Sequence, residues 1–290
     1  ALQAFVIAAG AIPIYFFAKY RARRYVLART RWRGLRFGID PGAWGYSWRA
    51  MIHWFLTILS VGFLLPRQMF WLEKYRTDRT WFGQDRFFQD GTWTMLLRPS
   101  IHFYIGLGLC LVSGIGGAIN PAVFSLFVIA APWLLVGWVH LQVAGFKVMA
   151  AHKRLGDNVT FRANPRSASI IGIYLFGSFL AYLVLMGVIV VAAIVAFTFL
   201  AIVDPNLFDG DNFDLVFTNG GPRQSVVIAA GALAYFSVFI FWGVLLQVFI
   251  TLPVMRHYAQ TLSVLDSHNL AVVNQRSRDE FTEAEGFADA

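Results

Sequence analysis

The sequence contains very little cysteine. Cys110 is its only cysteine, and it lies within an apolar run. A single thiol excludes an internal disulfide, and it excludes a metal site built from cysteine ligands alone. We interpret Cys110 as a packing residue.

Charged residues are also scarce. Only 14% of the residues are charged, 58% are hydrophobic, and the mean hydropathy is +0.58. Several windows hold about 20 apolar residues, the length that crosses a bilayer core. The composition therefore predicts an integral membrane protein. In such a chain the net charge of +8 indicates cytoplasmic loops and contact with anionic lipid, and we expect no nucleic-acid partner.

Signatures of catalysis are missing as well. The chain has no helical His-Glu-x-x-His, no phosphate-binding glycine loop and no Gly-x-Ser-x-Gly. Its apolar segments 99–119, 168–203 and 225–252 contain no Asp, Glu, Lys or Arg, which disfavours a proton-coupled carrier built on buried carboxylates. We therefore assign no catalytic residue and no cofactor, and enzymatic activity stays open because interfacial loops can carry catalytic groups.

The chain does contain a recurring unit, made of an apolar segment, a proline and a stretch of basic and aromatic residues. The first basic arm, residues 19–37, follows Pro13, and the second basic arm, residues 74–87, follows Pro66. Looser echoes follow two later prolines. This pattern predicts an internal repeat.

The apolar segments also predict how the chain crosses the membrane. Five are expected to span it, namely residues 1–18, 99–119, 121–146, 168–203 and 225–252. We expect the basic loops on the inner side and the acidic loop 204–222 on the outer side. Residues 1–258 are predicted to form a single membrane domain, followed by a polar cytoplasmic tail over residues 259–290.

A sixth apolar segment, residues 44–65, has basic residues on both flanks. We interpret it as a re-entrant hairpin that enters at Trp48, turns near Gly62 and returns to the same face by Pro66. A simple crossing and a tilted or interfacial helix are the alternatives.

Short stretches bounded by Gly, Asp or Asn and rich in aromatic or β-branched residues predict strands. They are Gly34 to Ile39, Gln84 to Phe88, Asn158 to Arg162 and Leu270 to Val273. We expect them to pair into a small cytoplasmic sheet. The predicted fold class is an all-α polytopic membrane protein with short strands between its helices.

Three sets of residues are candidates for function. Small residues at every fourth position predict a helix-packing stripe, made of Gly106, Cys110, Gly114 and Ala118. Basic and aromatic residues of the two arms are suited to anionic headgroups; they are Arg31, Trp32, Arg33, Arg36, Lys74, Tyr75, Arg76 and Arg79.

The third set is a pair of histidines. His102 and His140 lie at one depth on neighbouring antiparallel segments, counted from the turn at Asn120. Two such rings could hold a haem iron or another metal, but interfacial histidines beside tryptophans are the ordinary explanation. We assign no metal site and keep this pair as the weak candidate.

Two stretches carry a resemblance to a known family. Residues 29–38, read as Arg-Thr-Arg-Trp-Arg-Gly-Leu-Arg-Phe-Gly, and residues 59–66, read as Leu-Ser-Val-Gly-Phe-Leu-Leu-Pro, resemble segments of the YjgN-like bacterial inner-membrane proteins, a domain of unknown function. The resemblance implies a polytopic inner-membrane fold, a periplasmic outer loop and a further repeat before Ala1. It implies no substrate and no catalytic residue.

Together these observations lead to a first hypothesis, in which the chain binds, and translocates, a lipid or amphipathic molecule through its basic arms and re-entrant segment. The alternative is an accessory or scaffold subunit of a larger membrane complex. A membrane enzyme or haem protein is the third. Expected partners are anionic lipids, and membrane proteins or a second copy of the chain.

Overall fold

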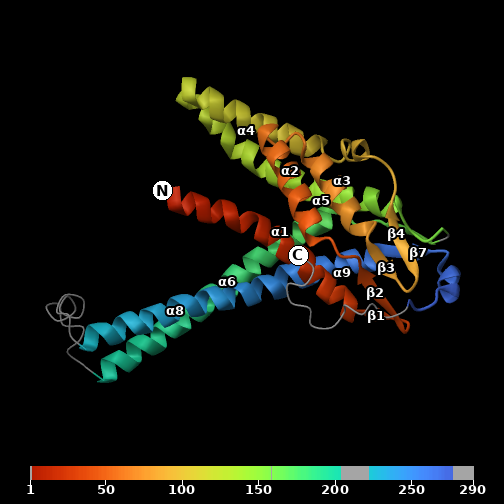
Figure 1. The fold of residues 1–290 in the computed structure, drawn as a ribbon. Coiled ribbons are helices and arrows are strands. Elements are labelled where there is room, and N and C mark those ends of the chain that lie inside the picture. Colours follow the sequence, from red (N-terminus) through yellow and green to blue (C-terminus); the bar gives the residue numbers. More distant parts are fainter. Residues whose placement is uncertain (1, 158, 204–221, 277–290) are drawn as a thin grey trace. The chain divides into compact units, whose positions relative to one another are not determined.

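Short strands alternate with helices in the computed structural model, which describes residues 2–157, 159–203 and 222–276. The chain divides into two compact units, one of residues 1–167 with 260–290 and one of residues 168–259. The first unit contains an antiparallel sheet of seven strands whose order follows the chain (Figure 1). The strands are β1 (Arg31–Trp32), β2 (Leu35–Ile39), β3 (Thr80–Phe82), β4 (Asp85–Gln89), β5 (Lys153–Leu155), β6 (Val159–Ala163) and β7 (Leu262–Leu265).

Tight turns with glycine join the strands in pairs. Gly34, Gly83 and Gly156 have φ values of 83°, 56° and 56°, which lie in the left-handed region that glycine adopts without cost. Gly83 also lies so close to the carbonyl oxygen of Asn274 that no Cβ would fit there. These turns therefore specify the hairpins β1–β2, β3–β4 and β5–β6.

Each of the three hairpins follows directly on a helix. The helices of the first unit are α1 (Leu2–Arg29), α2 (Ala43–Leu59), α3 (Leu65–Thr77), α4 (Ile101–Ile119) and α5 (Phe127–Ala151), with the short 3₁₀ helices η1 (Trp93–Leu96), η2 (Pro121–Leu126) and η5 (Ser267–Val272). α1, α3 and α5 are the helices that lead into a hairpin. The internal repeat that the sequence suggests stays a prediction.

The strands correct the predicted all-α class. Three of the four expected strands are present within one residue, as β2, β4 and β6. The fourth prediction, residues 270–273, is wrong, because most of this stretch is η5 and the strand lies earlier, at β7. Leu270 and Val273 are 7% and 8% exposed, since a spacing of three places both on one face of a 3₁₀ turn and against the sheet.

The helix pair α2–α3 leaves the sheet and returns to the neighbouring strand. β2 precedes α2, β3 follows α3, and Ile39 is paired with Thr80. The chain reverses at Val61 and Gly62, whose φ values are 52° and 90°, so the turn lies where the sequence predicts it. The sequence predicts that the return ends by Pro66, but Pro66 lies in the first turn of α3, where its missing N–H costs nothing, and the helix continues to Thr77. Entry of this pair into the membrane stays a prediction.

Four helical stretches of the described residues are long and apolar enough to cross a membrane. Two are α4 and the continuous η2–α5, and the other two belong to the second unit, which contains α6 (Ser167–Val203), α8 (Pro222–Leu246), the π-helical turn η4 (Gln247–Thr251) and α9 (Leu252–Thr261). They coincide with four of the five predicted crossings. The crossing at residues 1–18, of which residues 2–18 lie in α1, stays a prediction, and nearly all of the loop 204–222 lies outside the described residues.

Candidate functional site

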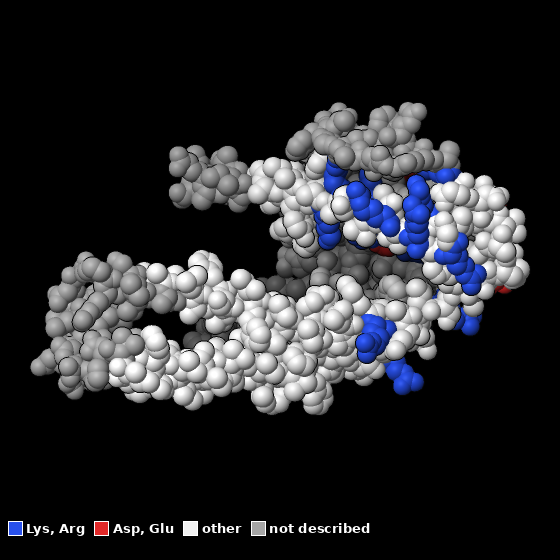
Figure 2. Space-filling view, turned by 90° about the horizontal axis from the view of Figure 1, so that it is seen from below, with Lys and Arg blue, Asp and Glu red and all other residues white. Residues whose placement is uncertain are grey.

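The first basic arm forms the end of α1 and the hairpin β1–β2. Lys19, Arg29, Arg31 and Arg33 are exposed, and the sequence has no acidic residue from Lys19 until Asp40. Figure 2 shows lysine and arginine side chains gathered on the unit that carries the sheet. These four side chains therefore place positive charge at the surface of the arm.

Aromatic rings of the arm lie beneath its guanidinium groups. The Arg29 guanidinium carbon is 3.5 Å from the centre of the Tyr25 ring, and that of Arg33 is 4.7 Å from the Trp32 ring. Tyr25 is 61% exposed and Trp32 is 42% exposed. Cations stacked on exposed rings combine an anion-binding surface with an apolar one.

The hairpin itself holds two features that cost stability. Arg31 lies directly opposite Arg36 in the β1–β2 register, and like charges in that position repel. Arg33 has a φ of 50° at a turn position where Asn or Gly is favoured. Strained or repelling groups that persist in a fold often belong to a functional site.

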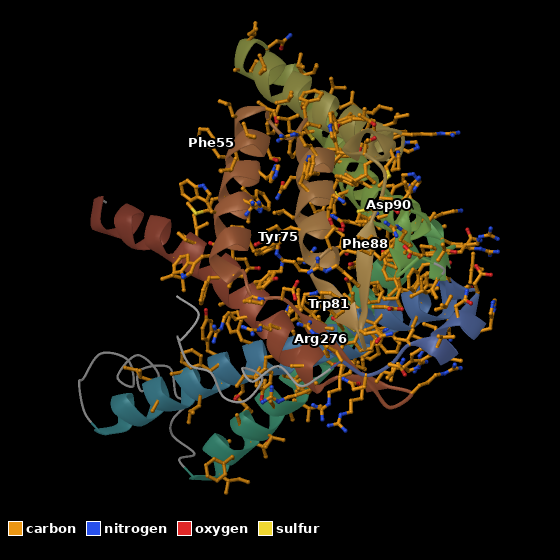
Figure 3. All side chains as sticks on the ribbon, turned by 45° about the vertical axis from the view of Figure 1, so that its right-hand side comes forward. Phe55, Tyr75, Trp81, Phe88, Asp90 and Arg276 are labelled. Carbon is orange, nitrogen blue, oxygen red and sulfur yellow. The ribbon has the colours of Figure 1, made fainter. Side chains whose placement is uncertain are left out.

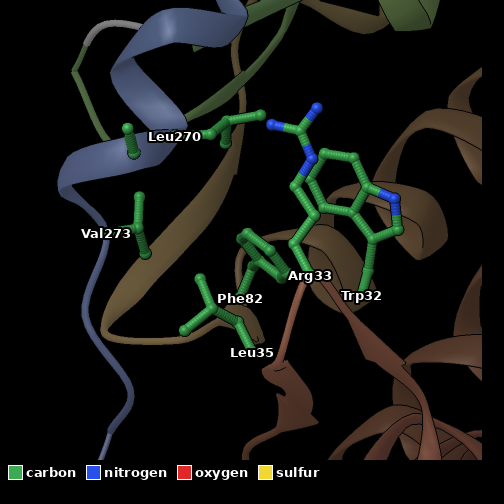
Figure 4. A pocket seen from close by; sticks show the side chains of 7 residues that line it. Trp32, Arg33, Leu35, Phe82, Leu270 and Val273 are labelled. Carbon is green, nitrogen blue, oxygen red and sulfur yellow. The ribbon is translucent and has the colours of Figure 1, made fainter.

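A pocket of about 200 Å³ adjoins the arm. Trp32 and Arg33 form part of its wall and Phe82 lies between them and the C-terminal segment (Figure 4). The Trp32 and Phe82 ring centres are 5.6 Å apart. The lining residues are Trp32, Arg33, Leu35, Phe82, Leu270, Ala271 and Val273, so among the described residues of this wall only Arg33 carries a charge.

The second basic arm differs because its cations are paired within the fold. Lys74 Nζ lies 2.9 Å from Asp78 Oδ2 and donates to the carbonyl oxygen of Gln89 at 2.6 Å. The Arg79 guanidinium stacks on the Tyr75 ring at 3.7 Å, and Tyr75 is only 8% exposed. This arm therefore contributes to packing more than to the charged surface.

Glu73 gathers three cations from different elements. Its carboxylate lies 2.6 Å from Arg76 Nη2 on the same helix and 2.9 Å from Lys153 Nζ on β5. Burial of this carboxyl by itself raises its pKa, but Lys153, Arg76 and Arg23 outweigh burial and hold the pKa well below its usual range. The carboxylate thus ties α1, α3 and the sheet together.

Three tyrosines pack behind the first basic arm. The ring centres of Tyr20, Tyr46 and Tyr75 are 5.4 to 6.1 Å apart. The Tyr20 hydroxyl donates to the Asp40 carbonyl oxygen at 2.7 Å, and Tyr75 donates to the Gly42 carbonyl oxygen at 3.0 Å. Burial raises the pKa of Tyr20, so its hydroxyl stays neutral and keeps the proton that it donates to Asp40.

Asp40 is a residue that sequence reasoning missed. Its carboxylate accepts a hydrogen bond from Trp81 Nε1 at 2.6 Å and pairs with Arg86. Arg276 lies 3.8 Å from it and stacks on the Trp81 ring (Figure 3). The available signal was its position as the first acidic residue after the arm, directly behind a predicted strand.

The two histidines lie together, as their equal depth suggests. The ring centres of His102 and His140 are 5.2 Å apart, and His140 Nδ1 is 3.1 Å from Ser167 Oγ. Among the described residues no group of three or more His, Cys, Asp or Glu side chains is placed to hold a metal ion. A metal or haem at this pair stays a weak prediction.

The helix-packing stripe is used unevenly. A Cβ on Gly106 would lie 2.5 Å from the Leu134 Cα of α5, whereas one on Gly114 would meet nothing within 4 Å. Cys110 lies half-buried between them, and Ala118 is exposed. On α5, the helix that faces α4, Gly137 lies against the backbone carbonyl of His102. The predicted stripe did not include Gly137.

Four long apolar helices, joined in one chain to a charged sheet, fit a polytopic helical membrane protein. The model of a family described as bacterial protein of unknown function, DUF898, matches residues 1–200. The chain belongs to this family, which confirms the resemblance in residues 29–38 and 59–66. No curated protein and no solved structure matches the chain. The match includes the first basic arm and Phe82, while Leu270 and Val273 lie beyond it.

Proposed function

We propose that the chain binds the anionic headgroup of a lipid or another amphipathic molecule at the first basic arm. One observation carries this proposal: Trp32 and Arg33 belong both to the exposed basic surface and to the wall of a pocket whose other lining side chains are apolar. A ligand with a charged end and an apolar end matches this combination. An anion between Arg31 and Arg36 would also relieve their repulsion.

The charge of the arm sets the expected strength of binding. A basic residue near an anionic surface contributes about 1 kcal/mol. Four exposed cations, Lys19, Arg29, Arg31 and Arg33, thus supply about 4 kcal/mol, or roughly a thousandfold in affinity. The apolar pocket adds selectivity for a ligand that can insert a side group beside Trp32.

The helix pair α2–α3 supports a position of this arm at the membrane surface. Large apolar side chains near its turn are exposed, with Ile58 at 71%, Leu59 at 70% and Phe63 at 51%. The start of α2 and the end of α3 both adjoin the sheet. If the turn between α2 and α3 lies in the bilayer, the sheet and the first basic arm therefore lie on the same side of the membrane. By the positive-inside rule this is the cytoplasmic side of the inner membrane.

Translocation of the bound molecule is the further part of the proposal. The turn between α2 and α3 and the π-helical η4 both interrupt regular helix. Interrupted helices at membrane depth are where many transporters form their binding sites. Headgroup capture at the arm is the first step in this proposal and is tested first.

The test compares two double variants in nanodiscs of mixed neutral and anionic phospholipid. The first variant, Arg31→Gln with Arg33→Asn, removes two charges, and Asn suits the left-handed turn, so the hairpin is not weakened. The control, Arg98→Gln with Arg162→Gln, removes two exposed charges elsewhere on the same unit. Native mass spectrometry measures the lipid that each protein retains.

We expect the arm variant to bind anionic lipid roughly 30-fold more weakly, from about 1 kcal/mol per charge. The control should retain lipid as the native protein does. Equal retention by both variants would contradict the proposal. A stoichiometric protein partner without retained lipid would instead make the arm an assembly surface of a larger complex.

A further inference from the structure

The last described residues of the chain run beside the first basic arm. The Gln84 N–H donates to the Asn274 carbonyl oxygen at 2.9 Å, and the Arg36 N–H donates to Gln275 Oε1 at 2.9 Å. Arg276 then reaches Asp40 and the Trp81 ring. The chain is therefore anchored next to β2 at the point where residue 277 follows.

The sequence that follows has the opposite charge to the arm. Residues 277–290 contain five carboxylates and one arginine, a net charge of −4. The carboxylates are Asp279, Glu280, Glu283, Glu285 and Asp289. Because the whole chain has a net charge of +8, residues 1–276 together carry +12.

We propose that residues 277–290, the acidic tail, bind the first basic arm and compete there with anionic headgroups. The competition rests on the proposed function, whereas the docking of the tail does not. Fourteen residues span up to about 46 Å when extended, so the tail reaches Arg29, Arg31 and Arg33 from its anchor. A short tether of this kind holds a segment at an effective concentration in the millimolar range.

The same charges make the contact reversible. Ion pairs between exposed side chains contribute less than about 1 kcal/mol each and weaken as salt rises. An anionic membrane offers many competing charges at about 1 kcal/mol for each base of the arm. The tail therefore covers the arm when anionic ligand is scarce and yields it when such ligand is abundant.

The experiment uses the full chain with three tails. In the neutral tail the five carboxylates are changed to Asn or Gln, and in the charge-conserving tail Asp and Glu are exchanged for each other. Phenylglyoxal, which modifies exposed guanidinium groups, is applied in an uncharged detergent without lipid. Peptide mass spectrometry follows Arg31 and Arg33, with Arg162 on β6 as the internal reference. A second measurement titrates phosphatidylglycerol in nanodiscs of phosphatidylcholine.

We expect the neutral tail to raise labelling of Arg31 and Arg33 at least threefold and to leave Arg162 unchanged. Phosphatidylglycerol binding should strengthen by about the same factor as the labelling, because both report the fraction of time for which the tail occupies the arm. The charge-conserving tail should behave as the native one. Unchanged labelling, or equal effects of both altered tails, would overturn the docking. Faster labelling with no phosphatidylglycerol bound by any form would support the docking and refute both the competition and the proposed function.

Discussion

Replacing Glu73 by glutamine tests whether one carboxylate holds the first unit together. The substitution keeps the shape of the side chain and removes the charge that compensates Lys153, Arg76 and Arg23. The Glu73 side chain is 18% exposed and that of Lys153 is 24% exposed, so solvent screens the three cations only partly. Removing one partner of a largely buried ion pair costs about 3 kcal/mol or more.

Thermal unfolding in detergent measures the effect. A loss of about 3 kcal/mol lowers the melting temperature by roughly 6 °C or more for a chain of this size. The matched control is Asp157→Asn, because Asp157 pairs with Arg154 at 3.3 Å but is 92% exposed. An exposed pair of this kind contributes about 0.5 kcal/mol or less, so the control should melt within about 2 °C of the native protein.

A second substitution identifies the cause. Adding Lys153→Gln to Glu73→Gln removes one of the excess cations, so the double variant should be more stable than the sum of the single losses predicts.

The pH dependence of stability tests the same carboxylate. Because the pKa of Glu73 is lowered in the fold, its stabilisation is complete above the unfolded pKa of about 4.3 and is lost as the pH falls below that value. Equal melting of the Glu73 and Asp157 variants, or an unchanged acid profile in the Glu73 variant, would refute this reasoning.

Two further predictions concern close approaches of the backbone. Gly83→Ala should cost about 3 kcal/mol, because a methyl group meets the Asn274 carbonyl at a positive φ; Gly34→Ala shares the positive φ but has nothing within 4 Å, so it should cost only about 1 kcal/mol. Gly137→Leu should separate α4 from α5 and lower the melting temperature by several degrees, since the His102 carbonyl would lie 2.6 Å from the new Cβ, while Gly114→Leu should leave it nearly unchanged. Similar melting within either pair of variants would contradict these assignments.

Much of the helical framework follows from local sequence. Four crossings were predicted because uninterrupted apolar runs of about 20 residues have few other stable arrangements. The reversal near Gly62 was also predictable, because basic residues on both flanks of segment 44–65 indicate a return to the same side and glycine allows a tight turn. Three strands were found because glycine bounds an aromatic or β-branched stretch on one side.

The remaining elements depend on partners distant in the chain. β1 and β3 are two and three residues long, too short to show an alternating pattern. Leu270 was assigned to a strand because a short apolar run such as residues 270–273 fits both the periodicity of a strand and that of a helix. The basic residues of the candidate site could be identified from the sequence. The pocket could not, because Leu270 and Val273, which line it together with Trp32, lie more than 200 residues away in the chain.

The order of the strands has a consequence for how the protein is made. Each strand pairs with its neighbours along the chain, from β1 to β7, so no strand must wait for a later one before it joins the growing edge. As synthesis proceeds from the N-terminus, α1, α3 and α5 are each followed directly by a hairpin that extends this edge. Until β7 arrives about 100 residues later, the N–H and C=O groups of β6 are open to pairing with another chain. The interval between β6 and β7 is therefore the stage of biogenesis at which the sheet is most exposed to misassembly.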